Sequence, residues 1–161
     1  MNFIQPELKT VHSYICNLDE NQTPLWGTLS PIGMVEHLTD SLNMASGKTK
    51  HDIEVPEKYW SKMSAILSSE NGMPKNFKAT FAPENRTIRN KNLTDALAEF
   101  ERAWIEYERV FEENENLINN HPNYGPLNKS QWKRLLSKHL THHFEQFSIH
   151  LRCSSAPINI T

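Results

Sequence analysis

A short stretch near the C-terminal end organises the chain: it reads SKHLTHHFEQF and covers residues 137–147. Three of the eight histidines lie in it, and two of these, His139 and His143, are four residues apart. In an α-helix, residues i and i+4 lie one turn apart on the same face. The two imidazoles can therefore approach one divalent metal ion, and the rest of the sequence must supply a third ligand.

The residues around this stretch predict one long helix. Asn128 is a favourable N-cap, and Gln131 follows three residues later, as in a capping box. The helix is expected to run to about Leu151. Its inner face consists of apolar residues at helical spacing: Trp132, Leu135, Leu136, Leu140 and Phe147.

The helical wheel places His139 and His143 inside this apolar stripe and His142 on its border. Lys138 and Glu145 point further out. A buried imidazole without a partner loses its hydration, and binding a metal ion is one way to compensate for that loss. The alternative is a pair of core histidines that are hydrogen-bonded to backbone carbonyls or to Glu and Ser neighbours. Spacing alone favours the alternative, because any histidine-rich helix contains pairs at i and i+4 by chance.

The best candidate for a third ligand is His37. Ser30 and Pro31 form an N-cap followed by proline at the first helical position, and the helix they open is expected to end at Ala45, before Gly47. His37 lies midway along this helix, as His139 and His143 do along theirs. Antiparallel packing of the two helices would bring all three imidazoles to a similar depth.

The remaining patterns complete an all-α fold. One helix is expected over Pro6–Leu18, and another from a cap at Thr94-Asp95 to about Asn116 or Leu117. Between the second and third main helices lies a long crossover, Lys48–Asn92, with a short extra helix that opens at Val55-Pro56-Glu57. No strand is predicted. We therefore expect a four-helix bundle that forms a single domain over residues 1–161.

Composition excludes several classes of protein. The formal net charge of −2 leaves no basic patch of the kind that binds nucleic acid or membranes. Cys16 and Cys153 are too few for a disulfide framework, so a reducing compartment is expected. The N-terminal residues lack the pattern of a signal peptide, and no apolar stretch is long enough to span a bilayer. The predicted location is the cytoplasm.

Familiar catalytic motifs are absent from the sequence, including the nucleophile elbow, the P-loop and the dinucleotide-binding glycine pattern. The zinc-protease motif His-Glu-x-x-His is absent too, because residue 140 is leucine. Glu36, next to His37, and Glu145 are candidates for a base or a supporting group. Helix geometry points Glu145 away, so no catalytic residue is assigned.

Two parts of the sequence resemble a known family. The segment TPLWGTLS of residues 23–30, followed by MVEHL of residues 34–38, resembles the entry to the second helix of DinB-like (YfiT-like) proteins. The segments HPNYGPL of residues 121–127 and HLTHHFEQF of residues 139–147 are similar to the loop and last helix of one uncharacterised branch.

This resemblance implies a four-helix bundle of unusual connectivity that holds a divalent metal ion with His37, His139 and His143. Members of the family include thiol-dependent S-transferases, a mycothiol-dependent isomerase and proteins described as metal-dependent hydrolases. The usual end of the last-helix motif is His-His-Arg-Gly-Gln. Here Phe144 and Glu145 replace the Arg and the Gly, so the contacts of that arginine are not carried over.

The sequence therefore predicts a metal-dependent enzyme, either a hydrolase or similar to the thiol-dependent S-transferases. Zinc or nickel is the expected ion, and a small molecule is the expected substrate. The alternative is a non-catalytic binding or stress-response module with a structural or vestigial metal site. Small bundles often form homodimers, and the sequence does not decide the oligomeric state of this one.

Overall fold

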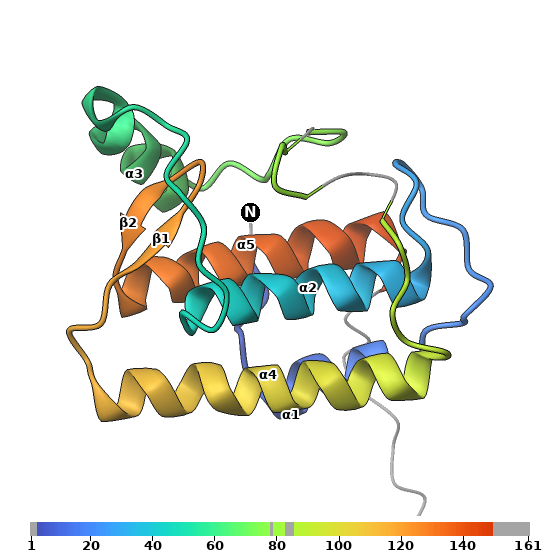
Figure 1. The fold of residues 1–161 in the computed structure, drawn as a ribbon. Helices are drawn as coiled ribbons and strands as arrows, with labels where there is room; N and C mark the ends of the chain where they lie inside the picture. The colour runs from blue at the N-terminus through green and yellow to red at the C-terminus, as the bar shows by residue number, and fades with distance from the viewer. Residues whose placement is uncertain (1–2, 78, 83–85, 150–161) are drawn as a thin grey trace, which may run out of the picture.

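The computed structural model describes residues 3–77, 79–82 and 86–149. This part of the chain is mostly helical, as predicted, with five α-helices, one 3-10 helix and one small sheet (Figure 1). The elements are α1 (Leu8–Ile15), α2 (Pro31–Ala45), η1 (Glu57–Tyr59), α3 (Trp60–Ser68), α4 (Leu93–Glu113), β1 (Asn119–His121), β2 (Gly125–Leu127) and α5 (Lys129–Gln146).

The two helices that carry the candidate ligands begin at the predicted caps. Ser30 Oγ accepts a hydrogen bond from the backbone N–H of Gly33 at 3.1 Å, and Pro31 occupies the first turn of α2. At the start of α5, Asn128 Oδ1 accepts from the backbone N–H of Gln131, and Gln131 Oε1 accepts from that of Asn128, both at 3.0 Å. Each cap satisfies backbone donors that a helix start leaves without partners.

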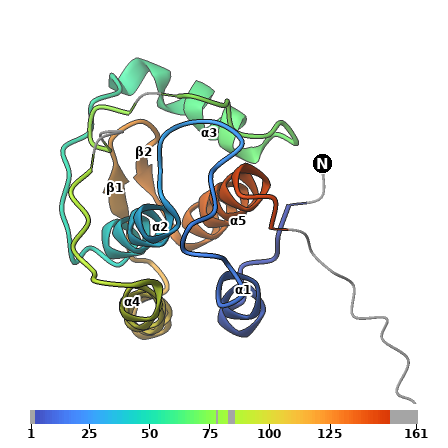
Figure 2. The same ribbon diagram turned by 90° about the vertical axis from the view of Figure 1, so that its right-hand side faces the viewer.

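Helices α2 and α5 pack side by side and run in opposite directions (Figure 1). Seen end-on, α4 lies beneath α2, and α1 lies beneath α5 (Figure 2). Helix α4 contacts both α2 and α1. Large side chains fill the space between the helices, and those of Phe100, Trp104, Phe111, Phe144 and Leu38 are fully buried. Burial of apolar surface on this scale is the main force that holds the helices together.

Some predicted helix ends were wrong. Helix α1 covers only Leu8–Ile15. Helix α4 starts two or three residues earlier than a cap at Thr94-Asp95 requires, because Asn92 Oδ1 accepts from the backbone N–H of Asp95 at 2.8 Å. It ends at Glu113, where Asn114 is already extended. Helix α5 ends at Gln146, ahead of Ser148 with its φ of +52°; the predicted end near Leu151 lies outside the described residues.

The prediction of an all-α fold holds only approximately, because the segment expected to be a loop forms a β-hairpin. Strands β1 and β2 are antiparallel, and His121 pairs with Gly125. Gly125 has a φ of +81°, and a Cβ atom there would lie 3.0 Å from Cδ1 of Trp60. The absence of a side chain thus permits both the tight turn and the packing of the Trp60 indole on the hairpin. Strands of three residues are too short to show alternation in the sequence.

The predicted extra helix in the crossover corresponds to η1 and α3, which lie over the hairpin and the first half of α5 (Figure 1). Lys138, expected to point outward, is only 4% exposed. Its Nζ donates to the backbone carbonyls of Ile66 (2.9 Å), Leu67 (3.1 Å) and Ser69 (3.0 Å). These are the last carbonyls of α3, where a helix carries partial negative charge. The long side chain thus ties the crossover to α5.

Candidate metal centre

The three predicted ligands meet between α2 and α5. Nε2 of His139 lies 2.8 Å from Nε2 of His37 and 2.9 Å from Nε2 of His143. One ligand atom from each residue can be chosen so that all three lie within 4.8 Å of one another. His139 and His143 are buried, and His37 is half-buried. This arrangement is compatible with a site for a metal ion.

Helix geometry explains how the three rings converge. His139 and His143 are one turn apart on α5, with ring centroids separated by 4.6 Å. His37 comes from the middle of α2, and its ring meets the other two nearly edge-on at centroid distances of 4.7 and 5.0 Å. The antiparallel packing of α2 and α5 brings residues about 100 positions apart to one level of the protein.

Gln146 determines which nitrogen of His143 carries the proton. The amide Nε2 of Gln146 donates to the backbone carbonyl of Trp26 at 2.7 Å, and a carbonyl can only accept. The amide oxygen Oε1 therefore faces Nδ1 of His143, 2.7 Å away, and accepts its proton. Nε2 of His143 is left with a lone pair that points to the centre of the three rings.

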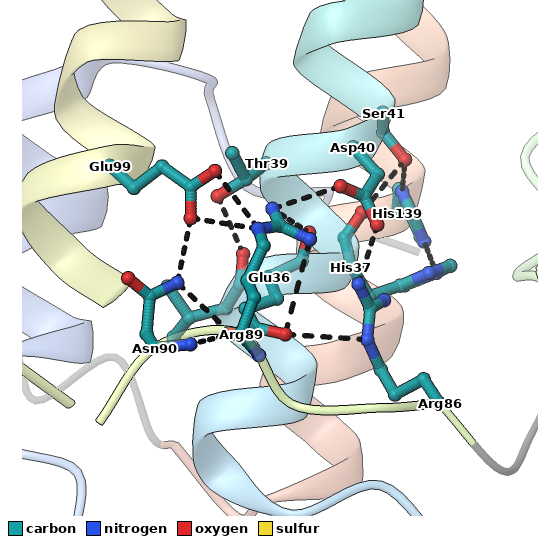
Figure 3. A network of polar contacts seen from close by, with 11 residues as sticks. Glu36, His37, Thr39, Asp40, Ser41, Arg86, Arg89, Asn90, Glu99 and His139 are labelled. Carbon is teal, nitrogen blue, oxygen red and sulfur yellow. Dashed lines mark hydrogen bonds and ion pairs between the residues drawn. The ribbon is translucent and has the colours of Figure 1, made fainter. Parts of the chain in front are cut away.

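Ser41 determines which ring nitrogen of His139 carries the proton. Its Oγ donates to the backbone carbonyl of His37 at 3.3 Å and lies 3.3 Å from Nδ1 of His139 (Figure 3). Because the hydroxyl proton is used toward the carbonyl, the oxygen accepts from Nδ1–H. Nε2 of His139 therefore also carries a lone pair. A histidine that binds a metal ion usually donates its other ring N–H in this way.

Electrostatics disfavours an additional proton between Nε2 of His139 and Nε2 of His143. Burial is the largest of several effects on all three rings: the pKa of His37 is lowered to about 4, and the pKa values of His139 and His143 lie well below the usual 6.5. Arg86 is the second cause of the low pKa of His37, and the His37 imidazole in turn lowers the pKa values of His139 and His143. At neutral pH the rings are uncharged, and two lone pairs face each other at 2.9 Å. A cation between them would remove that repulsion.

The three histidines line a cavity of about 370 Å³. Most of the remaining wall is apolar and aromatic, and it includes Trp26, Met63, Phe77, Phe81, Trp132 and Leu136. A concave, mainly apolar site with a few convergent polar groups is the usual form of a pocket for a small molecule.

Two other residues near the histidines do not join them. His142, which the sequence placed on the border of the stripe, is half-buried and packs its ring against Trp26 at a centroid distance of 5.6 Å. It lines the cavity but does not belong to the cluster of ligand atoms. Glu145 is exposed, as helix geometry predicted.

Glu36 is fully buried but faces away from the histidines (Figure 3). Its Oε1 accepts from the backbone N–H of Arg89 (2.9 Å) and of Asn90 (2.7 Å), and from the side-chain amide of Asn90 (3.0 Å). Arg86 bridges this carboxylate and Asp40. Glu36 therefore anchors the segment before α4 onto α2, and a role as a base beside His37 does not fit its position.

Three polar residues of the site were not identified from the sequence. Gln146 and Ser41 had a weak signal, because they follow His143 and His37 by three and four residues on the same helix faces. His121, which the sequence placed only in a loop, is 8% exposed and lines the same cavity. Its position depends on a hairpin that the sequence did not reveal.

Fold and site define a mostly helical protein with a cluster of three histidines at the wall of an apolar cavity. The model of a family described as a protein of unknown function (DUF1569) matches residues 4–149, and the chain belongs to that family. Comparisons with curated proteins and with solved structures gave no match. Among the described residues, no helix has the length and hydropathy needed to cross a bilayer.

Proposed function

We propose that this protein is a metal-dependent enzyme of small-molecule chemistry, with a divalent ion, zinc or nickel, held by His37, His139 and His143. Such an ion, when bound, supplies Lewis acidity that lowers the pKa of a coordinated water or thiol toward neutrality. The reaction class that fits is hydrolysis or transfer of a thiol sulfur, as in the DinB-like proteins that the sequence resembles. The same resemblance supports a four-helix bundle formed by α1, α2, α4 and α5.

One observation carries the proposal: the uncharged rings of His37, His139 and His143 converge, while the opposite ring nitrogens of His139 and His143 are engaged. Nδ1 of His143 donates to Gln146, and Nδ1 of His139 donates to Ser41. Core histidines that served packing alone would have no reason to direct their Nε2 lone pairs at one another. Neutral imidazole is a standard ligand of zinc and nickel.

The surroundings of the three histidines suit catalysis in three respects: an open coordination position, a cavity for a substrate and a fixed orientation of the His143 ring. Three protein ligands leave a coordination position open, as catalytic zinc sites do. The cavity that the histidines line would hold a substrate next to that position and exclude bulk water from it. Gln146, which is fastened to the carbonyl of Trp26, keeps the His143 ring from rotating.

Elemental analysis of the purified protein tests the metal site. We expect close to one equivalent of zinc or nickel in the unaltered protein and a large loss in His37→Ala, His139→Ala and His143→Ala. His142→Ala is the matched control, because it removes a neighbouring imidazole of the same cavity and should keep the metal. Unchanged metal content in the three ligand variants would disprove the site.

A second candidate function is a non-catalytic binding module in which the metal ion has only a structural role. It is favoured by exposed apolar side chains on the crossover, with Tyr59 44% and Phe77 61% exposed, since such groups suit a surface for a partner or a second copy. A large loss of thermal stability with a chelator, without turnover on hydrolysis or thiol-transfer panels, would support it. Sedimentation analysis would show whether a homodimer forms.

A further inference from the structure

A further histidine, His121, lines the cavity and differs from the three clustered histidines in its position and its hydrogen bonds. It lies on β1, outside the cluster of three histidines, and is enclosed by aromatic rings. Its ring centroid lies 5.3 Å from that of Phe81, 4.9 Å from that of Tyr124 and 5.6 Å from that of Trp132. These contacts hold the ring in one orientation at the cavity wall.

The proton of His121 is on the opposite nitrogen from those of His139 and His143. The backbone N–H of Asn123 donates to Nδ1 of His121 at 3.1 Å. Because a backbone N–H can only donate, Nδ1 must carry a lone pair, and the proton of the neutral ring is on Nε2. Burial lowers the pKa of His121 to about 3, so the ring stays neutral at physiological pH.

This Nε2–H is a donor without an acceptor: the described residues form no hydrogen bond to it. It is also not one of the fully enclosed polar atoms that lack a partner. Nε2 therefore contacts open space, and the open space that His121 lines is the cavity. A donor kept among aromatic rings without an acceptor costs free energy, which a ligand with an acceptor atom would recover.

The cation at the cavity wall is engaged elsewhere. Arg86 lines the cavity, but its Nη2 donates to Asp40 at 2.6 Å and its Nε lies 3.6 Å from Glu36. Two carboxylates thus compensate its charge. The uncharged N–H of His121 is a donor that can orient a ligand, on a wall that is mostly apolar and aromatic.

We propose that His121 determines specificity, and that its Nε2–H selects small molecules with a carbonyl-type oxygen on an apolar, aromatic body. As a statement about the substrate this rests on the proposed function. The donor itself belongs to the hairpin and does not depend on a metal ion.

The test compares two probes of the same shape, acetophenone and α-methylstyrene, in which a CH₂ group replaces the carbonyl oxygen. Binding is measured by NMR titration on the protein as purified and again after treatment with a chelator. One hydrogen bond to a neutral donor should favour acetophenone about two- to tenfold in Kd. His121→Phe keeps the aromatic packing and removes the donor, so the two Kd values should become equal. His121→Gln retains a donor and should keep part of the preference.

His51→Phe is the matched control, because His51 also packs on Phe81, at a centroid distance of 6.2 Å, but does not line the cavity. It should leave the preference unchanged. Three results would each overturn the proposal: an Nδ1–H tautomer of His121 in the ¹⁵N spectrum, failure of both probes to bind, or an unchanged preference in folded His121→Phe. The tautomer is read on the unaltered protein, so the test does not depend on that variant folding.

The two proposals fail separately. A preference that depends on His121 in protein that binds no metal would refute the metal-dependent function and leave the donor in place. A loaded metal site without any preference for acetophenone would refute only the role of His121.

Discussion

Nδ1 of His143 lies 2.7 Å from Oε1 of Gln146, and this contact connects the candidate ligand to the loop before α2. Nε2 of the same Gln146 amide donates to the backbone carbonyl of Trp26, which belongs to that loop. A single side chain therefore sets the tautomer of His143, the orientation of its ring and the position of the loop. Groups that orient a ligand in this way are part of a metal site as much as the ligands are.

Gln146→Leu should weaken metal binding without removing a ligand. The leucine has a similar size but cannot accept the proton of Nδ1, so the ring of His143 is free to rotate and to change tautomer. Loss of such a contact typically lowers metal affinity about 10- to 100-fold. Competition with a chromophoric chelator measures the change.

The control for Gln146→Leu is Glu145→Leu, at a neighbouring exposed position on α5. It should leave metal affinity unchanged. Equal affinities in the Gln146 variant and the unaltered protein would mean that this contact does not organise the site.

Lys138→Met should destabilise the protein and leave the cluster of three histidines intact. The methionine fills most of the same space but cannot donate to the three carbonyls at the end of α3. A buried acceptor that loses its partner costs about 1–3 kcal/mol, and we expect a loss of that order in the free energy of unfolding from urea denaturation. Lys133→Met, on the exposed side of α5, should stay within about 0.5 kcal/mol. A Lys138 variant as stable as its control would contradict this role.

Glu36→Ala should be among the most destabilising single substitutions in the chain. It removes the acceptor of three N–H groups and leaves the charge of Arg86 with Asp40 alone. Breaking a buried ion pair by deleting one partner costs about 3–5 kcal/mol. Thermal and urea unfolding measure the loss, and Asp95→Ala, in the exposed first turn of α4, should cost clearly less. A small effect at Glu36 would show that the segment before α4 is held by other contacts.

Stability should fall as the pH is lowered below about 6.5. The folded-state pKa values of His37 and His121 are about 4 and about 3, below the ordinary 6.5. Between these values the unfolded chain binds protons that the folded protein does not, so acid favours unfolding. The contribution of the two groups is fully present above pH 6.5 and is lost as the pH falls toward 4 and then 3.

Urea midpoints at a series of pH values measure this dependence. His121→Phe should make it shallower, because one of the two groups is removed. A midpoint that does not change between pH 7 and pH 5 would contradict burial of neutral histidines.

Much of the helical framework could be predicted because it depends on local chemistry. The N-cap at Ser30 and the capping box of Asn128 and Gln131 involve residues three positions apart, so the starts of α2 and α5 were correct. The same reasoning misplaced the start of α4 by two or three residues, since several polar residues near it can cap a helix. The hairpin was missed because its three-residue strands carry no periodic signal.

The sequence by itself determined that His139 and His143 share a helix face, because that relationship lies within one turn. Which groups they face was decided only by the tertiary structure. His37 reaches His139 across 102 residues, Trp26 reaches Gln146 across 120, and Ile66 reaches Lys138 across 72. The direction of a buried polar side chain follows from the partner that packing brings to it. Packing between distant segments therefore decided the burial of Lys138, the tautomer of His143 and the free donor of His121.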